Sequence, residues 1–313
     1  MTLGEMEKVK AAETLLKEAG FTVSQRCISR PSCFDIAARK NKSIILIKFH
    51  KDIGCVSPRD SLELRIISEN ISASSLLISE RTREKPLEDD TVYSRYNIMA
   101  VTSKTFENIV LRKIYPLIQA GPGGYYVEIN GEAIKNRRQE LGLSVGDVAE
   151  KIGISRRTLY GYERGMAKAS VLAAYNLVCT LGVPIAKTVN IFEIYKNQKK
   201  QFISRARRII TGNKLLQKIF SKLSRYDIVA VKKAPFDFLI TIPEEQIKIL
   251  GGVTEEGENS LSQRVNEILS LSKVVQAHPV LVTEKHPNSD MNISCIPSKE
   301  ISKIKHPEDL CKL

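Results

Sequence analysis

A segment of 35 residues in the middle of the chain, residues 131–165, constrains the fold more than any other part of the sequence. Its apolar residues recur at the spacing expected for three short helices that pack on one another. These residues are Ile134, Leu141, Val145, Val148, Ala149, Ile152, Ile154, Leu159 and Tyr162. Ser144 and Ser155 stand where the second and third helices would begin, and serine is a favoured N-cap because its hydroxyl accepts a hydrogen bond from the first turn. Gly153 suits the turn between these helices, so the segment predicts an all-α unit.

A fourth helix follows. Leu172, Ala173, Leu177 and Leu181 recur at helical spacing, and Gly182 ends the periodic stretch just before a proline. Glycine is the usual residue after a helix C-terminus because it adopts the left-handed conformation without strain. The helical unit is therefore expected to reach beyond residue 181.

The order of residues in this segment is also distinctive. It reads Ser-x-x-x-x-Ala from position 144, Gly-apolar-Ser from position 153, and apolar-x-x-aromatic-Glu-x-Gly from position 159. This pattern resembles the Cro/cI-type helix-turn-helix family over about 55 residues. The resemblance implies binding to double-stranded DNA, with the second helix of the motif entering the major groove, and a structural role for the glutamate. Many members carry glutamine directly after the first serine to support a phosphate contact; Val145 stands there in this chain.

Candidate DNA-binding side chains gather at the start of the expected third helix. Arg156 and Arg157 begin it, and an arginine can read guanine O6 and N7 with two parallel hydrogen bonds. The alternative is that these two arginines form a solvated basic face. The candidates on this unit are Ser144, Ser155, Arg156, Arg157, Thr158, Tyr160 and Arg164.

Most of the excess positive charge lies in forty residues. The formal net charge is +13, and residues 186–225 hold 11 Lys and Arg residues against one acidic residue. Within residues 196–210, apolar side chains recur at helical spacing opposite the cations, which predicts a basic amphipathic helix. Beside a helix-turn-helix, this favours contact with DNA phosphates; the alternative is an anionic membrane surface. The candidate phosphate-binding residues are Lys199, Lys200, Arg207 and Arg208.

The regions on either side of the helical unit are expected to be α/β and to be copies of each other. Strands and helices alternate before residue 112, as in α/β folds. Four short sequence matches occur in the same order in both regions: 31–35 with 234–237, 61–66 with 260–265, 76–80 with 280–284, and 97–104 with 292–299. Residues 226–313 are therefore predicted to be a shortened copy of residues 20–112 that lacks the first helix unless residues 214–223 supply it.

These observations predict four segments. Gly121–Gly124 contains three glycines and a proline, and we place a domain boundary there. The segments are an α/β domain (1–124), the helix-turn-helix domain (125–190), a basic linker helix (191–225) and the second, smaller α/β domain (226–313).

The first α/β region carries Asp35 at a strand end and Lys48 thirteen residues later. This resembles the restriction-endonuclease-like fold, or PD-(D/E)xK fold, of Holliday-junction resolvases. The resemblance implies two acids that bind Mg²⁺ and a lysine that orients the attacking water. The second acid should stand at position 46, which is Leu46. Asp35 and Lys48 are therefore expected to be remnants of a site.

The C-terminal copy is also incomplete by this criterion. It keeps Asp237, but the positions 11 and 13 residues further on are Lys248 and Leu250. A hard cation needs several oxygen ligands, so we expect no catalysis and no metal or other cofactor. In this case Asp35 and Asp237 would be polar residues that cap turns. The alternative is a Mg²⁺-dependent nuclease or junction resolvase whose second acid has migrated, for example to Glu13.

The remaining sequence features exclude several classes. No apolar run is long enough to span a bilayer, and residues 1–18 lack the apolar core of a signal peptide. The six cysteines form no C-x-x-C pair and only four histidines exist, which argues against disulfides and structural zinc. We expect a cytoplasmic, chromosome-associated protein with no membrane partner. The sequence identifies no small-molecule effector.

The whole arrangement resembles a group of archaeal HTH-type transcriptional regulatory proteins. The resemblance implies a transcription regulator that reads a specific DNA sequence. One helix-turn-helix reads one half-site, so we expect a homodimer that pairs through the α/β copies. The alternative is a monomer in which the two copies pair with each other inside one chain.

Overall fold

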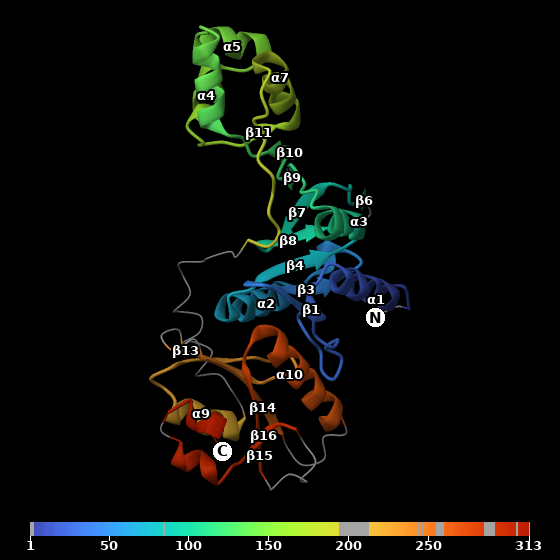
Figure 1. The fold of residues 1–313 in the computed structure, drawn as a ribbon, viewed down its shortest axis with the longest axis vertical. Coiled ribbons are helices and arrows are strands. Elements are labelled where there is room, and N and C mark those ends of the chain that lie inside the picture. The colour runs from blue at the N-terminus through green and yellow to red at the C-terminus, as the bar shows by residue number, and fades with distance from the viewer. Residues whose placement is uncertain are drawn as a thin grey trace. The chain divides into compact units, whose positions relative to one another are not determined.

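The computed structural model describes residues 3–83, 85–193, 213–242, 245, 247–254, 260–284, 292–304 and 306–312 (Figure 1). Contacts divide the chain into two compact units. The first combines Met1–His50, Cys55–Leu77 and Phe192–Leu313, and the second combines Lys51–Gly54 and Ile78–Ile191. Among the described residues, no helix has both the length and the apolar character needed to cross a membrane.

The N-terminal part of the first unit is an α/β layer. Its elements are α1 (Leu3–Glu18), β1 (Thr22–Val23), β2 (Ile36–Lys40), β3 (Ser43–Phe49), α2 (Pro58–Ile71) and β4 (Ser74–Ile78), with the short helix η1 (Ile53–Cys55) before α2. The strands are ordered β1-β2-β3-β4, and β2 is antiparallel to both β1 and β3. Asn41 takes a left-handed conformation (φ +55°) in the tight β2–β3 turn, which asparagine tolerates well.

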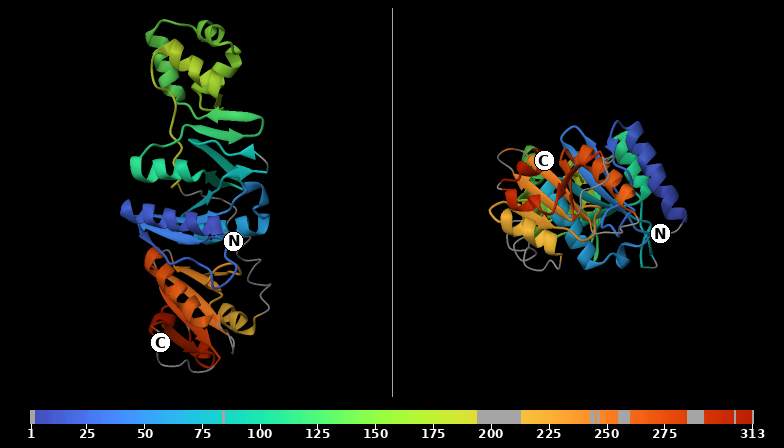
Figure 2. Two further views of the ribbon diagram at one scale, coloured as in Figure 1. Left: turned by 90° about the vertical axis from the view of Figure 1, so that its right-hand side faces the viewer. Right: turned by 90° about the horizontal axis from the view of Figure 1, so that it is seen from below.

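The C-terminal part of the first unit repeats this layer (orange to red in Figure 2). Its elements are α9 (Lys214–Lys222), β12 (Asp227–Ala230), β13 (Phe238–Ile242), β14 (Ile247–Thr254), α10 (Leu261–Val275), β15 (His278–Thr283), β16 (Ser294–Pro297), η3 (Glu300–Lys303) and α11 (Asp309–Lys312). The strand order is β12-β13-β14-β15-β16, antiparallel up to β14 and parallel from there. The copy therefore has a first helix, because α9 buries its apolar face in this core.

Helix ends and hydrogen bonds fix how the two copies correspond. Helix α2 ends at Ser72 and α10 ends at Gln276, both in the left-handed conformation and 204 residues apart. Strands β4 and β15, which follow these helices, begin at positions with the same separation. This register pairs Arg264 with Asp60. The sequence match that paired Arg264 with Arg65 was therefore wrong by five residues, because short Ser-Leu-x-x-Arg strings recur on helices without marking the same turn.

The second unit joins a small sheet to the helical unit. Its first elements are β5 (Arg81–Thr82), β6 (Lys85–Pro86), β7 (Thr91–Arg95), β8 (Ile98–Val101), α3 (Ser103–Glu107), the π-helix η2 (Asn108–Arg112), β9 (Ile118–Gly121) and β10 (Gly124–Val127). The strands are ordered β8-β7-β9-β10-β11, where β11 is Ala169–Ser170. The glycine cluster 121–124 forms the turn of the β9–β10 hairpin, with Gly123 at φ +83°.

Four helices form the helical unit: α4 (Gly131–Glu140), α5 (Val145–Ile152), α6 (Arg156–Glu163) and α7 (Val171–Leu181). The expected apolar positions are mostly buried in one core, as the sequence predicted; Leu141 and Leu172 are the exceptions and are exposed. Gly131 permits the closest helix contact, since a methyl group there would lie 2.3 Å from the carbonyl oxygen of Tyr162 at the end of α6. Only glycine lets α4 begin against α6 in this way.

Candidate nucleic-acid interface

Serine caps fix the starts of the two helices of the motif. The Ser144 hydroxyl accepts a hydrogen bond from the Asp147 N–H (3.1 Å), and the Asp147 carboxylate accepts one from the Ser144 N–H (2.7 Å). The Ser155 hydroxyl accepts one from the Thr158 N–H (3.0 Å). These bonds confirm both predicted caps. The hydrogen bonds from Ser144 also hold the pKa of Asp147 below its usual value.

Gly153 ends α5 and sets the turn into α6. It has φ +74°, and its N–H donates to the carbonyl of Glu150 (3.2 Å). A residue with a Cβ would be strained in this left-handed conformation. The predicted turn is confirmed, and it presents the first turn of α6 on the surface.

Four of the predicted residues of α6 and its C-cap are exposed: Arg156, Arg157, Tyr160 and Arg164. The guanidinium of Arg164 lies over the Tyr160 ring, 4.2 Å from its centroid. The side chain of Arg156 packs against the first turn of α5. A methyl group at Gly146 would be only 3.0 Å from its Nε. Thr158 is half-buried, and its hydroxyl is 2.8 Å from that of Ser155, so it supports the cap.

The motif glutamate is structural. Glu163 accepts two hydrogen bonds from Arg138 of α4, at 2.6 Å from Nε and 3.2 Å from Nη2, and both side chains are largely buried. Arg138 also donates to the carbonyl oxygen of Leu143 (2.9 Å). A two-bond arginine–carboxylate pair fixes geometry as well as charge, so this pair holds α6 against α4. The structural role expected for Glu163 is confirmed.

Two further parts of the predicted interface are Val145 and the basic segment. Val145, which replaces the usual glutamine, is half-buried and packs against the helical core. The basic segment with Lys199, Lys200, Arg207 and Arg208 lies outside the described residues, so its helix and its phosphate contacts stay predictions.

In the first copy, the nuclease-like residues Asp35 and Lys48 form hydrogen bonds with each other and with the backbone of their own chain. The Asp35 carboxylate is buried and accepts from Lys48 Nζ (3.0 Å) and from the Phe49 N–H (2.7 Å). Lys48 also donates to the carbonyl oxygen of Ser32 (3.0 Å). Leu46 is fully buried in β3, and burial raises the pKa of Glu13 on α1. Asp35 and Lys48 therefore tie β2, β3 and the preceding loop together.

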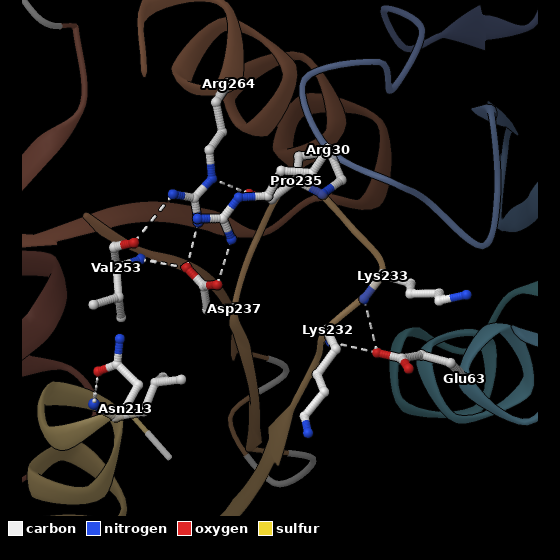
Figure 3. Close-up of polar contacts among 10 residues, drawn as sticks. Arg30, Glu63, Asn213, Lys232, Lys233, Pro235, Asp237, Val253 and Arg264 are labelled. Atoms are coloured by element: carbon white, nitrogen blue, oxygen red, sulfur yellow. Dashed lines mark hydrogen bonds and ion pairs between the residues drawn. The ribbon is translucent and has the colours of Figure 1, made fainter. Parts of the chain in front are cut away.

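In the second copy, an arginine on a helix takes the place of the strand lysine (Figure 3). Asp237 accepts from the Val253 N–H (2.6 Å), from Arg264 Nη2, and from Arg30 of the first copy (2.6 Å). Arg264 is fully buried and also donates to the carbonyl oxygens of Pro235 (2.6 Å) and Val253 (3.0 Å). Its positive charge compensates the carboxylate of Asp237, whose side chain is 14% exposed.

The same hydrogen bonds correct the predicted equivalents of the motif. The Asp35 N–H donates to Ile47 and the Asp237 N–H to Gly251, so the second hairpin is two residues longer. The residues that correspond to Leu46 and Lys48 are therefore Leu250 and Gly252, and the prediction of Lys248 and Leu250 was wrong. A methyl group at Gly252 would lie 3.5 Å from Arg264 Nη2, so the arginine fills the space that the lysine has in the first copy.

Two buried glutamates that sequence reasoning missed join the copies. Glu63 of α2 accepts from the N–H groups of Lys232 and Lys233 (3.0 Å to the latter; Figure 3), and Glu267 of α10 accepts from those of Ile28 (3.0 Å) and Ser29 (2.9 Å). Glu63 and Glu267 are 204 residues apart in the sequence. The donors are related in the same way, since Ile28 corresponds to Lys232 and Ser29 to Lys233. Helix α2 packs on β13 and α10 on β2, so the contact has approximate twofold symmetry.

Comparison with known proteins supports this architecture. The model of the PD-(D/E)XK superfamily domain matches residues 5–116, and a helix-turn-helix model matches residues 134–187. An HTH-type transcriptional regulatory protein of Methanocella arvoryzae is 32% identical over 303 residues, covering 96% of this chain and 92% of that protein. One from Methanococcus vannielii is 32% identical over 97% of this chain and 96% of its own length.

The chain belongs to this family of HTH-type transcriptional regulatory proteins. A third relative, from Pyrococcus furiosus, is 29% identical over 96% of this chain. The expected fold class is confirmed: a restriction-endonuclease-like domain precedes a helix-turn-helix domain, and a second α/β layer follows. The helix-turn-helix match and these relatives support DNA-binding transcription regulation.

Proposed function

We propose that this chain reads a specific double-stranded DNA sequence with α6 and regulates transcription on the chromosome, without nuclease activity. The observation that carries the proposal is the cationic first turn of α6, which is exposed and fixed by its Ser155 cap. Arg157, the second residue of this turn, reads base edges in the major groove. The side chain of Arg156 lies against α5, which is the helix that crosses the DNA backbone in this motif. Arg156 therefore contacts phosphate.

The absence of catalysis is supported by the state of the two aspartates. Each carboxylate already accepts a backbone N–H and at least one cationic side chain. The position of the second acid is leucine in both copies. Binding Mg²⁺ at either aspartate would require breaking these bonds with only one carboxylate as compensation.

Selection of bound duplexes from a random pool, followed by incubation of the selected duplex with Mg²⁺, tests the proposal. We expect one enriched sequence and no cleavage. Cleavage that disappears in Asp35→Ala would contradict the absence of catalysis and favour the nuclease alternative. Recovery of duplexes with no shared sequence would contradict specific recognition.

The proposal includes two chains on one operator. The described residues of each chain contain one helix-turn-helix, and paired units read half-sites about 34–36 Å apart. The two α/β copies contact each other inside one chain, as in the alternative that the sequence left open, and this supports association of two chains through a different surface. Light scattering of the complex with the selected duplex should give two chains per DNA; one chain on a site without symmetry would contradict this part.

A further inference from the structure

Helix α7 carries an apolar stripe on its outer face. Leu172 and Tyr175 are 69% and 66% exposed, and Val171 and Val178 are 36% and 37% exposed. Cys179 is exposed as well. These positions recur every three or four residues and therefore lie on one side of the helix. The opposite side packs into the core of the helical unit through Ala173, Ala174, Leu177 and Leu181.

This helix contains no charged residue, and its polar residues Asn176 and Thr180 are half-buried. A surface helix normally carries charged and polar residues on its outer face, which α7 lacks along this stripe. A contiguous exposed apolar patch marks an interaction site. The outer face of α7 thus has the composition of an interface.

A second copy of the chain fits this face better than other occupants. Two chains with a formal net charge of +13 each repel one another, so they can approach most closely where the surface is uncharged, as it is along α7. The faces of α2 and α10 that could have joined two chains are already buried within one.

We propose that the α7 faces of two chains pack on each other around a twofold axis when two helix-turn-helix units occupy neighbouring half-sites. The inference rests on the proposed function. DNA reading and this contact are compatible, because α6 packs on α4 and α5, while α7 packs on α4, α5, β10 and β11. The two surfaces thus belong to different helices.

The size of the stripe sets the strength of the contact. A helix of 11 residues is about 16 Å long, which gives a contact well below the roughly 800 Å² per partner of a standard stable interface. The chains therefore associate weakly in solution, and the contact appears as cooperative binding on a duplex with two half-sites.

The test compares Leu172→Asp with Ile114→Asp. Ile114 is 52% exposed, belongs to the same unit, and lies outside the helical core, so it is a matched control. Leu172 is in the first turn of α7, where an aspartate is favourable for the helix dipole, so the variant should fold. We expect Leu172→Asp to bind the two-site duplex about 5- to 150-fold more weakly and the single half-site unchanged, with Ile114→Asp like wild type.

The outcomes separate the inference from the function on which it rests. Unchanged cooperativity in Leu172→Asp would overturn the inference while leaving DNA recognition intact. Failure of the wild type to prefer any sequence would instead overturn the proposed function. A lowered unfolding midpoint of free Leu172→Asp would show that another part of the same chain covers the stripe, and this also overturns the inference.

Crosslinking gives a second readout. Cys179 lies on the stripe, and among the residues that the structure describes Cys55 is exposed as well. In a Cys55→Ser background, a short bismaleimide should join two chains on the two-site duplex, and Cys179→Ser should abolish the product. An equal yield on the single half-site, or with Cys179→Ser, would contradict the proposed contact.

Discussion

Two adjacent arginines at the start of α6 have different surroundings. Both are exposed, but the side chain of Arg156 lies over Gly146 of α5. We expect Arg157→Ala to relax the base preference at one position by about 1–3 kcal/mol, because a two-bond contact with a base is lost. Arg156→Ala should weaken binding to all sequences and lower the salt dependence by about one phosphate contact. Site selection at two salt concentrations measures both effects, and identical profiles for the two variants would contradict this assignment.

The Arg138–Glu163 pair determines whether α6 is held in place. Its side chains are only 11% and 5% exposed, so Glu163→Ala leaves a largely buried arginine without its partner. We expect a loss of about 3 kcal/mol from the stability of the helical unit, because an unpaired buried charge is costly. Hydrogen exchange of α4 and α6 amides should report it.

The matched control is Glu140→Ala. Its partner Arg137 lies on the same helix, and the two side chains are 36% and 62% exposed. A solvent-exposed pair of this kind contributes at most about 1 kcal/mol. Equal acceleration of exchange in Glu140→Ala and Glu163→Ala would show that burial of the Arg138–Glu163 pair is not what holds α6.

At the scale of elements, local signals were predictable from the sequence and tertiary distances were not. Ser144, Ser155 and Gly153 act through bonds to residues three or four positions away, so their patterns identified the helix boundaries. Gly131 gave no such signal, because its necessity comes from a carbonyl group about thirty residues further along the chain. The same limit explains why Lys248 was taken for a motif position: a hairpin longer by two residues shifts every later position, and sequence counting does not detect the insertion.

The contact between the two α/β copies depends on Glu63 and Glu267. Glu267 accepts from two backbone N–H groups and also from the Ser29 hydroxyl (2.5 Å). Removing the carboxylate leaves these groups without an acceptor at a buried site, so Glu267→Ala should lower the free energy of unfolding by about 2–3 kcal/mol. Glu63→Ala should have a similar effect, since its acceptor geometry is equivalent. Circular dichroism in urea measures both, because the chain has no tryptophan.

A partly exposed glutamate of the second copy, Glu300, provides the comparison for these variants. Glu300 pairs with Lys303 within η3, where the lysine is 72% exposed. Glu300→Ala should therefore change the unfolding midpoint little. If Glu63→Ala and Glu267→Ala unfold at the wild-type urea concentration, the two copies are not held together through these carboxylates.

At the scale of the whole molecule, the two α/β copies keep the same arrangement around their aspartates with different residues. Each aspartate accepts a hydrogen bond from a backbone N–H on the second strand of its hairpin. The donor is Phe49 of β3 in one copy and Val253 of β14 in the other. The cation beside it comes from β3 in the first copy and from α10 in the second. The same structural role is thus filled by different residues, which is why matching the motif letter by letter failed in the C-terminal copy.

Positive charge is concentrated in residues 186–225, and this concentration leads to a prediction about the salt dependence of DNA binding. Lys199, Lys200, Arg207 and Arg208 lie in the most basic stretch of the sequence. Replacing all four by glutamine should weaken binding to every duplex and lower the slope of log affinity against log salt by about 3 to 4, since each phosphate contact contributes roughly 0.9. A control with Lys10, Lys17, Lys273 and Lys303 replaced removes the same charge from exposed sites on other elements. If both variants lower the slope equally, net charge rather than phosphate contact is responsible; if neither does, the basic segment has a role away from DNA, such as the membrane surface that its amphipathic pattern also allows.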